Sequence, residues 1–422
     1  MSQTEVNPHH RSNPWVVPGK WTVSRYDFEP EVRQDWSLPA QVKIHDVTLR
    51  DGEQWPGVVL QKAEKLRIAH ALADLGVQRV EGGMPVVCEE DVDAVRAMCR
   101  EIRSAEISAL VRPFQTDMEL AASCGVRHVV LEVLAMPLAM QLFFGGSVEK
   151  CVEECIKLTE FAAQNGIQTT LFLSDTTRAE LALLASLVEP ISTQGKITSV
   201  AVVDTRGCAL PQAMAWLVTS IRSMTTLPIE VHAHHDFGMA TATTLAAVAA
   251  GAEVMHTAVN GLNGNAALDE CVMGAEALLG VDTGVQLAGL TAISELVEEA
   301  SGAGWYKPFV GPGLNRQEVG TVALPMWLYR DQGGFGQSDI FPNYQVVGGK
   351  AVELVLGKMS GKYSIAFKAW QLGLTIPSEE ATTEILSQIK SISQREKRLV
   401  TEEEFRAMHE TITAQMPGPP VT

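Results

Sequence analysis

Basic residues are comparatively scarce in this 422-residue sequence. Lys and Arg together number 33 against 50 Asp and Glu, which gives a formal net charge of −17. Non-specific nucleic-acid binding depends on basic side chains that neutralise phosphates, so this composition argues against it. Acidic small molecules are still acceptable ligands, because a few local arginines or a metal ion can bind them. We therefore expect small-molecule partners and no nucleic acid.

Paired cysteine motifs are missing. The seven cysteines are odd in number and irregularly spaced, and no CxxC pair occurs. Disulfide frameworks and zinc knuckles both require regular pairs, so we predict free thiols in a reducing cytoplasm. Cys151 and Cys155, four residues apart on a predicted helix, are interpreted as packing residues.

Long apolar runs are also absent. No stretch of 18 consecutive apolar residues suggests a membrane span, and the first residues, "MSQTEVNPHHRSNPWVVPGKW", lack the basic-then-apolar pattern of a signal peptide. We expect no membrane association and a cytoplasmic location. The hydrophobic share of 46% is typical of a globular protein with a large core.

From about residue 41 to 300 the chain alternates between short β-branched runs and longer helical stretches. We predict eight strands: 41–49, 78–85, 106–112, 128–135, 168–175, 197–204, 228–236 and 253–260. Eight β/α units in some 250 residues are typical of a (β/α)8 TIM barrel. A doubly wound open sheet usually has fewer strands and a Gly-rich phosphate turn after the first strand, and neither feature occurs here. The predicted fold class is therefore α/β.

The flanking regions differ in character. Residues 1–40, rich in Pro, Trp and polar groups, predict an irregular N-terminal arm that packs on the barrel or on a partner subunit. Residues 301–350 are Gly- and Pro-rich and predict a linker or lid; "GGFG" at 333–336 lacks the lysine of a phosphate loop. Residues 351–422 predict a mainly helical C-terminal subdomain, in which Thr401 and Glu404 form a capping box.

Charged and hydroxyl residues gather where the predicted strands end. They are Arg50, Asp51, Glu81, Arg112, Ser174, Asp175, Asp204, Thr205, His234, Asp236 and Asn260. The carboxyl ends of barrel strands carry the active site in TIM-barrel enzymes. We therefore expect a site at this edge.

Two stretches suggest a metal site there. "KIHDVTLRDGEQWPG" (43–57) places Arg50 and Asp51 after the first strand. "EVHAHHDFG" (230–238) places His232 and His234 on one face of the seventh strand, because side chains alternate along a strand. With Asn265, just beyond the eighth strand, the candidate ligands are Asp51, two imidazoles and an amide oxygen. This mixed set suits a divalent ion such as Mg, Mn, Zn or Co.

An open divalent site beside an arginine suggests a reaction class. A 2-oxo acid can chelate such a metal through its carboxylate and ketone oxygens, and the metal then polarises the ketone. Arg50 would stabilise the oxygen that gains negative charge while a carbon–carbon bond forms or breaks. Thr205 and Arg206 could hold the far carboxylate, and Arg112 is another candidate anion clamp.

The motifs "TLRDGEQWPGV", "VEGGMP", "VDTRG", "VHAHHDFGMA" and "VNGL" followed by "GNAALDE" occur in the order found in a known family. The chain resembles the DRE-TIM metallolyases over about residues 41–280. It is most similar to isopropylmalate, homocitrate and citramalate synthases, and HMG-CoA lyase is more distant. "GKMSG" and the terminal helices resemble the C-terminal subdomain of the synthases.

The resemblance implies roles for particular residues. Asp51, His232, His234 and Asn265 would be the metal ligands. Arg50 would be the catalytic electrophile, and Gln54, Glu81 and Thr205 would be substrate-site residues; we assign Arg50, Glu81 and Thr205 to catalysis. The implied reaction condenses an acyl-CoA, usually acetyl-CoA, with a 2-oxo acid, and the thioester is then hydrolysed. A homodimer that exchanges C-terminal segments is also implied.

The sequence departs from the family pattern in several places. The loop after the eighth strand, "GLNGN", is short; the family's "HESGxH" has no match; Met359 replaces a histidine; and Trp55 stands where a small residue is common. The fourth-strand region around Glu132 also differs. The catalytic base therefore stays open among Glu81, His256 and Tyr363. A metal-dependent lyase or aldolase, and a non-catalytic descendant, remain alternative interpretations.

Overall fold

The computed structural model describes residues 13–17, 21–302, 316–328, 330 and 352–415. Eight parallel strands close into a barrel in the order β10-β3-β4-β5-β6-β7-β8-β9. Their bounds are Lys43–Asp46 (β3), Arg79–Glu81 (β4), Glu106–Val111 (β5), His128–Leu134 (β6), Gln168–Ser174 (β7), Ser199–Asp204 (β8), Ile229–Ala233 (β9) and Val254–Thr257 (β10). Each lies inside one of the eight predicted ranges, so the predicted TIM barrel is confirmed.

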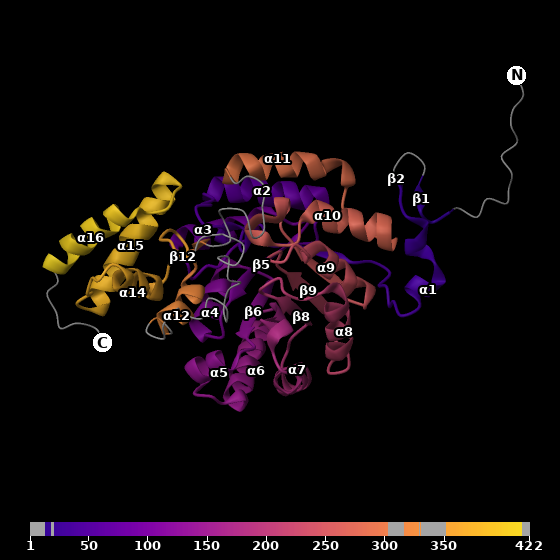
Figure 1. The fold of residues 1–422 in the computed structure, drawn as a ribbon, viewed down its shortest axis with the longest axis horizontal. Helices are drawn as coiled ribbons and strands as arrows, with labels where there is room; N and C mark the ends of the chain where they lie inside the picture. Colours follow the sequence, from indigo (N-terminus) through magenta and orange to yellow (C-terminus); the bar gives the residue numbers. More distant parts are fainter. Residues whose placement is uncertain (1–12, 18–20, 303–315, 329, 331–351, 416–422) are drawn as a thin grey trace, which may run out of the picture.

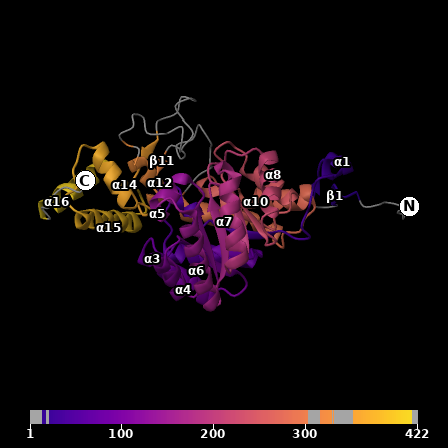
Figure 2. The same ribbon diagram turned by 90° about the horizontal axis from the view of Figure 1, so that it is seen from below.

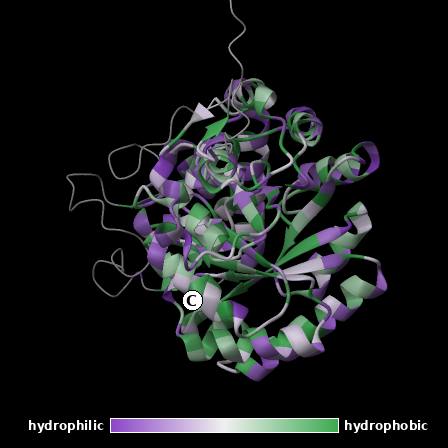
Figure 3. Cartoon of the chain, turned by 90° about the vertical axis from the view of Figure 1, so that its right-hand side faces the viewer, coloured by the Kyte–Doolittle hydropathy of each residue, from purple (hydrophilic) through white to green (hydrophobic). Residues whose placement is uncertain are grey.

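Helices surround the barrel (Figure 1). They are Lys62–Leu75 (α2), Glu89–Glu101 (α3), Gln115–Cys124 (α4), Pro137–Phe144 (α5), Val148–Gln164 (α6), Leu181–Gln194 (α7), Pro211–Arg222 (α8), Ala240–Ala249 (α9), Leu268–Met273 (α10) and Leu290–Ser301 (α11). Figure 3 shows that these helices are striped in purple and green, which is the amphipathic pattern of a helix that covers a sheet. None of the helices in the described ranges is long and apolar enough to cross a membrane.

The strands are buried on both faces. On β7, Leu171 and Leu173 belong to the large core between strands and helices, whereas Phe172 points into the barrel and packs with Val130 and Val203. This alternation follows the two-residue period of a strand. The barrel interior is therefore filled with side chains, and the functional site must lie at its mouth.

The N-terminal arm lies on the opposite side of the barrel from the C-terminal helices (Figure 1). Its described part contains a two-stranded pair, Val16–Val17 (β1) with Trp21–Thr22 (β2), a 3₁₀ turn Arg25–Phe28 (η1) and a short helix Pro30–Arg33 (α1). The Arg33 guanidinium donates to the carbonyls of Leu278 and Leu279 at 2.9 and 3.1 Å. The arm thus packs on its own barrel.

The C-terminal region has a small core of its own. Arg316–Gln317 (β11) pairs with Glu353–Leu354 (β12), and the helices are Gly320–Leu328 (α12), Lys362–Gln371 (α14), Glu379–Glu396 (α15) and Glu402–Gln415 (α16). Ile365, Ile385 and Phe405 are fully buried between α14, α15 and α16, which lie beside the barrel (Figure 2). The Thr401–Glu404 capping box is present, with both reciprocal hydrogen bonds.

Part of the predicted linker is ordered. Helix α12 lies within residues 301–350, where the sequence predicted only connectors. The "GGFG" stretch at 333–336 lies outside the described residues.

Candidate active site

Three strand ends bring the predicted ligands together at the barrel mouth. Asp51 follows β3, His232 is on β9, and His234 comes directly after β9. Asp51 Oδ2 lies 3.8 Å from His232 Nε2, and Asp51 Oδ1 lies 3.9 Å from His234 Nε2; the two imidazole nitrogens are 3.1 Å apart. Asn265, beyond β10, donates from Nδ2 to Asp51 Oδ1 at 2.9 Å. All four predicted ligands therefore lie in one cluster.

The donor atoms of this cluster fit a cation. Among the described residues, no hydrogen-bond donor contacts Asn265 Oδ1, although that oxygen is buried. A buried acceptor without a donor is costly unless a cation or water satisfies it. Carboxylate oxygen, amide oxygen and imidazole nitrogen are all ligands for divalent ions such as Mg, Mn, Zn and Co. The cluster could therefore hold a divalent ion.

The charge states also suit metal binding. Burial by itself raises the pKa of Asp51, but Arg50 and the two histidines outweigh it and hold that pKa well below its usual range. Burial, together with His234, lowers the pKa of His232 well below its usual value. Metal ligands must be deprotonated, and both side chains meet that condition near neutral pH.

Asn263 orients two of the ligands, a role that the sequence did not suggest. Its carbonyl lies 3.3 Å from His234 Nδ1, so Nδ1 is the donor and Nε2 is the ring nitrogen that is turned toward Asp51. Its side-chain amide also donates to Asp51 Oδ1 at 2.9 Å. Asn263 has φ 56°, and Asn260 in the same loop has φ 58°. Asn accepts this left-handed conformation more readily than most residues, which explains the Asn-rich sequence of the loop.

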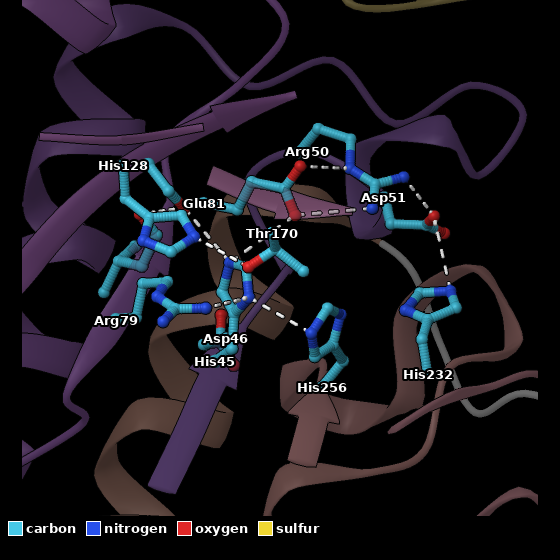
Figure 4. A network of polar contacts seen from close by, with 12 residues as sticks. His45, Asp46, Arg50, Asp51, Arg79, Glu81, His128, Thr170, His232 and His256 are labelled. Atoms are coloured by element: carbon cyan, nitrogen blue, oxygen red, sulfur yellow. Dashed lines mark hydrogen bonds and ion pairs between the residues drawn. The ribbon is translucent and has the colours of Figure 1, made fainter. Parts of the chain in front are cut away.

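Arg50 bridges the ligand cluster and Glu81. Its Nε and one terminal nitrogen donate to the two Glu81 oxygens at 2.8 and 3.3 Å, and its other terminal nitrogen donates to Asp51 (Figure 4). Burial disfavours the charged guanidinium, but Glu81 and Asp51 outweigh this and raise the pKa of Arg50. Arg50 is therefore a fixed positive charge beside the ligand cluster. Because both Glu81 oxygens accept from Arg50, Glu81 is placed to orient the arginine.

The other predicted residues are placed differently. Gln54, Thr205 and Arg206 line a cavity that lies above the ligand cluster. Thr205 Oγ1 accepts the backbone N–H of Asp175 at 2.7 Å. Arg112 is not brought to this cavity. Its guanidinium makes a bidentate ion pair with Asp117 at 2.7 and 3.0 Å, so it is already neutralised elsewhere.

The base stays unassigned. His256 lies deeper in the barrel, where Nε2 and Glu230 Oε2 are 2.7 Å apart. Tyr363 packs in the C-terminal region against a small apolar cluster that includes Ala323 and Met326 of α12. Neither is among the described residues that line the cavity.

The cavity above the ligand cluster has a volume of about 170 Å³. One wall is apolar and is formed by Met84, Leu110, Phe172 and Val203. Glu132 lies in the lining and accepts from Ser174 Oγ at 2.7 Å. The remaining wall comes from the C-terminal region: Arg316, Gln317, Glu318, Val319, Thr321 and Val322. The sequence predicted a linker or lid for residues 301–350, but it did not predict which of these residues line the cavity.

The fold and the site together define a (β/α)8-barrel enzyme whose strand ends build a site that could hold a divalent ion. The HMGL-like family model matches residues 41–297, and the chain belongs to this family. It is 36% identical over 379 residues to homocitrate synthase AksA of Methanopyrus kandleri, covering 87% of this chain and 92% of that protein. It is 33% identical over 391 residues to 2-isopropylmalate synthase of Methanocaldococcus jannaschii, covering 91% of this chain and 74% of that protein.

A solved structure supports the fold. The HMG-CoA lyase of Bacillus subtilis superposes with a TM-score of 0.58 at 22% sequence identity, covering 64% of this chain and 97% of that one.

Proposed function

We propose that this chain condenses an acyl-CoA, with acetyl-CoA as the first donor to test, with a 2-oxo acid. The products would be a 2-hydroxy dicarboxylic or tricarboxylic acid and free CoA. The observation that carries the proposal is the Arg50 guanidinium beside the cluster of Asp51, His232, His234 and Asn265. That arrangement places a fixed positive charge next to ligands for the ion that would bind the ketone.

The relatives favour condensation over cleavage. Both synthases align with 87% or more of this chain, so the similarity extends beyond the barrel into the C-terminal region. The HMG-CoA lyase structure covers 64% of this chain although it is itself covered to 97%. The C-terminal region is therefore shared with the synthases.

The chemistry divides among the residues of the site. When bound, a divalent ion would supply Lewis-acid polarisation of the ketone. Arg50, held by Glu81, would donate to the ketone oxygen as negative charge develops there, which lowers the barrier electrostatically. Thr205 and Arg206 would bind the far carboxylate. The apolar wall and the segment 316–322 would keep bulk water away from the reacting carbons.

The bond changes are those of a Claisen condensation. The donor loses a proton from the carbon next to the thioester, that carbon forms a bond to the ketone carbon, and the ketone oxygen becomes a hydroxyl. Hydrolysis then breaks the C–S bond and releases the CoA thiol.

The test is release of CoA thiol from acetyl-CoA with a panel of 2-oxo acids and Mn²⁺ or Mg²⁺. The proposal expects release that depends on one of the oxo acids and is lost in Arg50→Lys and Asp51→Asn variants. No oxo-acid-dependent release across the panel, with metal-dependent cleavage of a 2-hydroxy acid, would overturn it in favour of the lyase alternative.

We also propose that the enzyme acts in the cytoplasm as a homodimer. All seven cysteines are free thiols, as expected in a reducing compartment. The dimer follows from the resemblance to the synthases. Sedimentation at micromolar concentration tests it, and a single monomer species would contradict it.

A further inference from the structure

Four charged side chains form a buried cluster under the barrel mouth, next to the ligand site but outside it. Glu53, Lys65, Asp91 and Lys358 are each at most 1% exposed. Lys65 Nζ lies 2.7 Å from Glu53 Oε2 and 2.8 Å from Asp91 Oδ1. Lys358 Nζ lies 2.6 Å from Glu53 Oε1 and 3.1 Å from Asp91 Oδ1. Two positive charges face two negative charges, so the cluster, which we name the charge clamp, is neutral overall.

The clamp contacts the chain just before and just after the loop residues Arg50 and Asp51. Before these residues, the carbonyl of Leu49 accepts from Lys65 Nζ at 3.1 Å. After them, Glu53 accepts a hydrogen bond from Lys358 Nζ and forms an ion pair with Lys65. The intervening loop is short, so its position depends on these two fixed ends.

One of the two lysines comes from the other end of the chain. Lys65 is on α2, but Lys358 lies between β12 and α14, in the C-terminal region. The same segment is held over the mouth by Glu318, whose Oε1 accepts from the Met359 N–H at 2.8 Å. Glu318 itself lines the cavity. The docked C-terminal region therefore contacts the Arg50–Asp51 loop through Lys358.

We propose that Lys358 is a positioning residue that couples docking of the C-terminal region to the metal-binding geometry of Arg50 and Asp51. This rests on the proposed metal site. Lys358 Nζ is the contact that ties Glu53 to the C-terminal region, so Glu53 is released when Lys358 is removed, and the loss of one of its two cations destabilises the buried carboxylate further. Asp51, two residues away, then leaves its place opposite His232 and His234.

Such coupling is reciprocal. If docking of residues 357–371 strengthens metal binding, metal binding must strengthen docking by the same factor. The clamp would thus let the enzyme assemble its cation site only when the C-terminal wall of the cavity is in place.

The experiment compares Lys358→Met with Lys397→Met. Lys397 also joins the C-terminal region to the barrel, through Glu64 at 2.6 Å and the Ala300 carbonyl at 3.3 Å. Its hydrogen bonds and its ion pair go to these two residues, neither of which belongs to the clamp. Two readouts are taken on the full chain: affinity for Mn²⁺ by calorimetric titration, and backbone amide exchange in 47–56 without metal.

We expect Lys358→Met to weaken Mn²⁺ binding by roughly fivefold or more and to speed exchange in 47–56, whereas Lys397→Met changes neither. In the wild type, Mn²⁺ should slow exchange in 357–371. Wild-type Mn²⁺ affinity in folded Lys358→Met, or equal losses in both variants, would overturn the coupling.

A second variant keeps the test possible if Lys358→Met does not fold. Glu53→Gln with Lys358→Met removes one charge of each sign and leaves Lys65 paired with Asp91. The proposal expects this neutral variant to keep the fast exchange in 47–56 and the weak binding, because the contact itself is lost. Wild-type behaviour would show that only charge balance matters and would overturn it. The exchange readout needs neither metal nor substrate, so failure of the clamp is distinguishable from failure of the proposed reaction.

Discussion

At the scale of single residues, the ligand set depends on a neighbour that the sequence did not mark. Asp51, His232, His234 and Asn265 could be predicted to lie together because each is on a recognisable strand or shortly after one. Asn263 could not, because its contribution is a carbonyl and an amide aimed by a left-handed backbone. The available signal was the unusual density of Asn and Gly in the loop after β10.

Asn263→Gly tests that role. Glycine accepts the left-handed backbone, so the variant removes the amide contact with Asp51 at little cost in strain. We expect Mn²⁺ affinity to fall by about tenfold, the size seen when outer ligand partners are removed. Calorimetric titration measures it.

Asn260→Gly is the matched control, because Asn260 has the same backbone conformation but bonds to Ser294. It should bind Mn²⁺ as the wild type does. Equal affinities in the two glycine variants would show that Asn263 does not orient the site.

The raised pKa of Glu318 leads us to expect that the free energy of unfolding depends on pH. Burial raises its pKa from 4.5 to about 7. Between those values the folded state holds a proton that the unfolded state releases, so this contribution is full below about pH 4.5 and is lost as the pH rises through 7. We expect the free energy of unfolding to fall by up to about 3 kcal/mol across that window relative to Glu318→Gln.

Urea titrations of both proteins between pH 4.5 and 8 measure the difference. A parallel pH profile for wild type and Glu318→Gln would contradict this account of Glu318.

At the scale of elements, the eight strands and the edge where they end were predictable, because short β-branched runs and the polar residues that follow them are local signals. The polar layer inside the barrel was not. His45 and His256 lie close together inside the barrel (Figure 4), and Glu230 meets them from a third strand. Arg79 donates to both Glu230 oxygens at 2.9 and 3.0 Å. The sequence of each strand alone does not show which polar residues on the other strands its own will meet, so the network forms only once the barrel closes.

Arg79→Met tests whether this layer is held by its charges. Glu230 is fully buried, and burial by itself raises its pKa, but Arg79 together with the hydrogen bonds from His256 and His45 holds that pKa well below its usual value. Removing the arginine leaves a buried charge without its main partner, which should cost about 3–5 kcal/mol of unfolding free energy by urea titration.

Arg67→Met provides the comparison, since Arg67 and Glu299 form an exposed pair at 3.6 Å. It should cost less than about 1 kcal/mol. Similar losses in both variants would mean that burial of the Arg79 pair has no special effect.

At the scale of the whole molecule, the cavity is built from two regions: barrel residues that lie between positions 50 and 263, and C-terminal residues 316–322. The barrel supplies the ligand cluster and the apolar wall, and residues 316–322 supply the rest. The sequence predicted the barrel, the terminal helices and a linker or lid at 301–350, but not that α12 and the strand before it would line the cavity. Long-range docking of this kind leaves no periodic pattern in either segment.

The central claim is that a divalent ion binds among Asp51, His232, His234 and Asn265. The most direct measurement is anomalous diffraction from crystals soaked with Mn²⁺. The account predicts a single strong peak within ligand distance of all four side chains. A peak elsewhere, or no peak at this cluster at millimolar Mn²⁺, would contradict it.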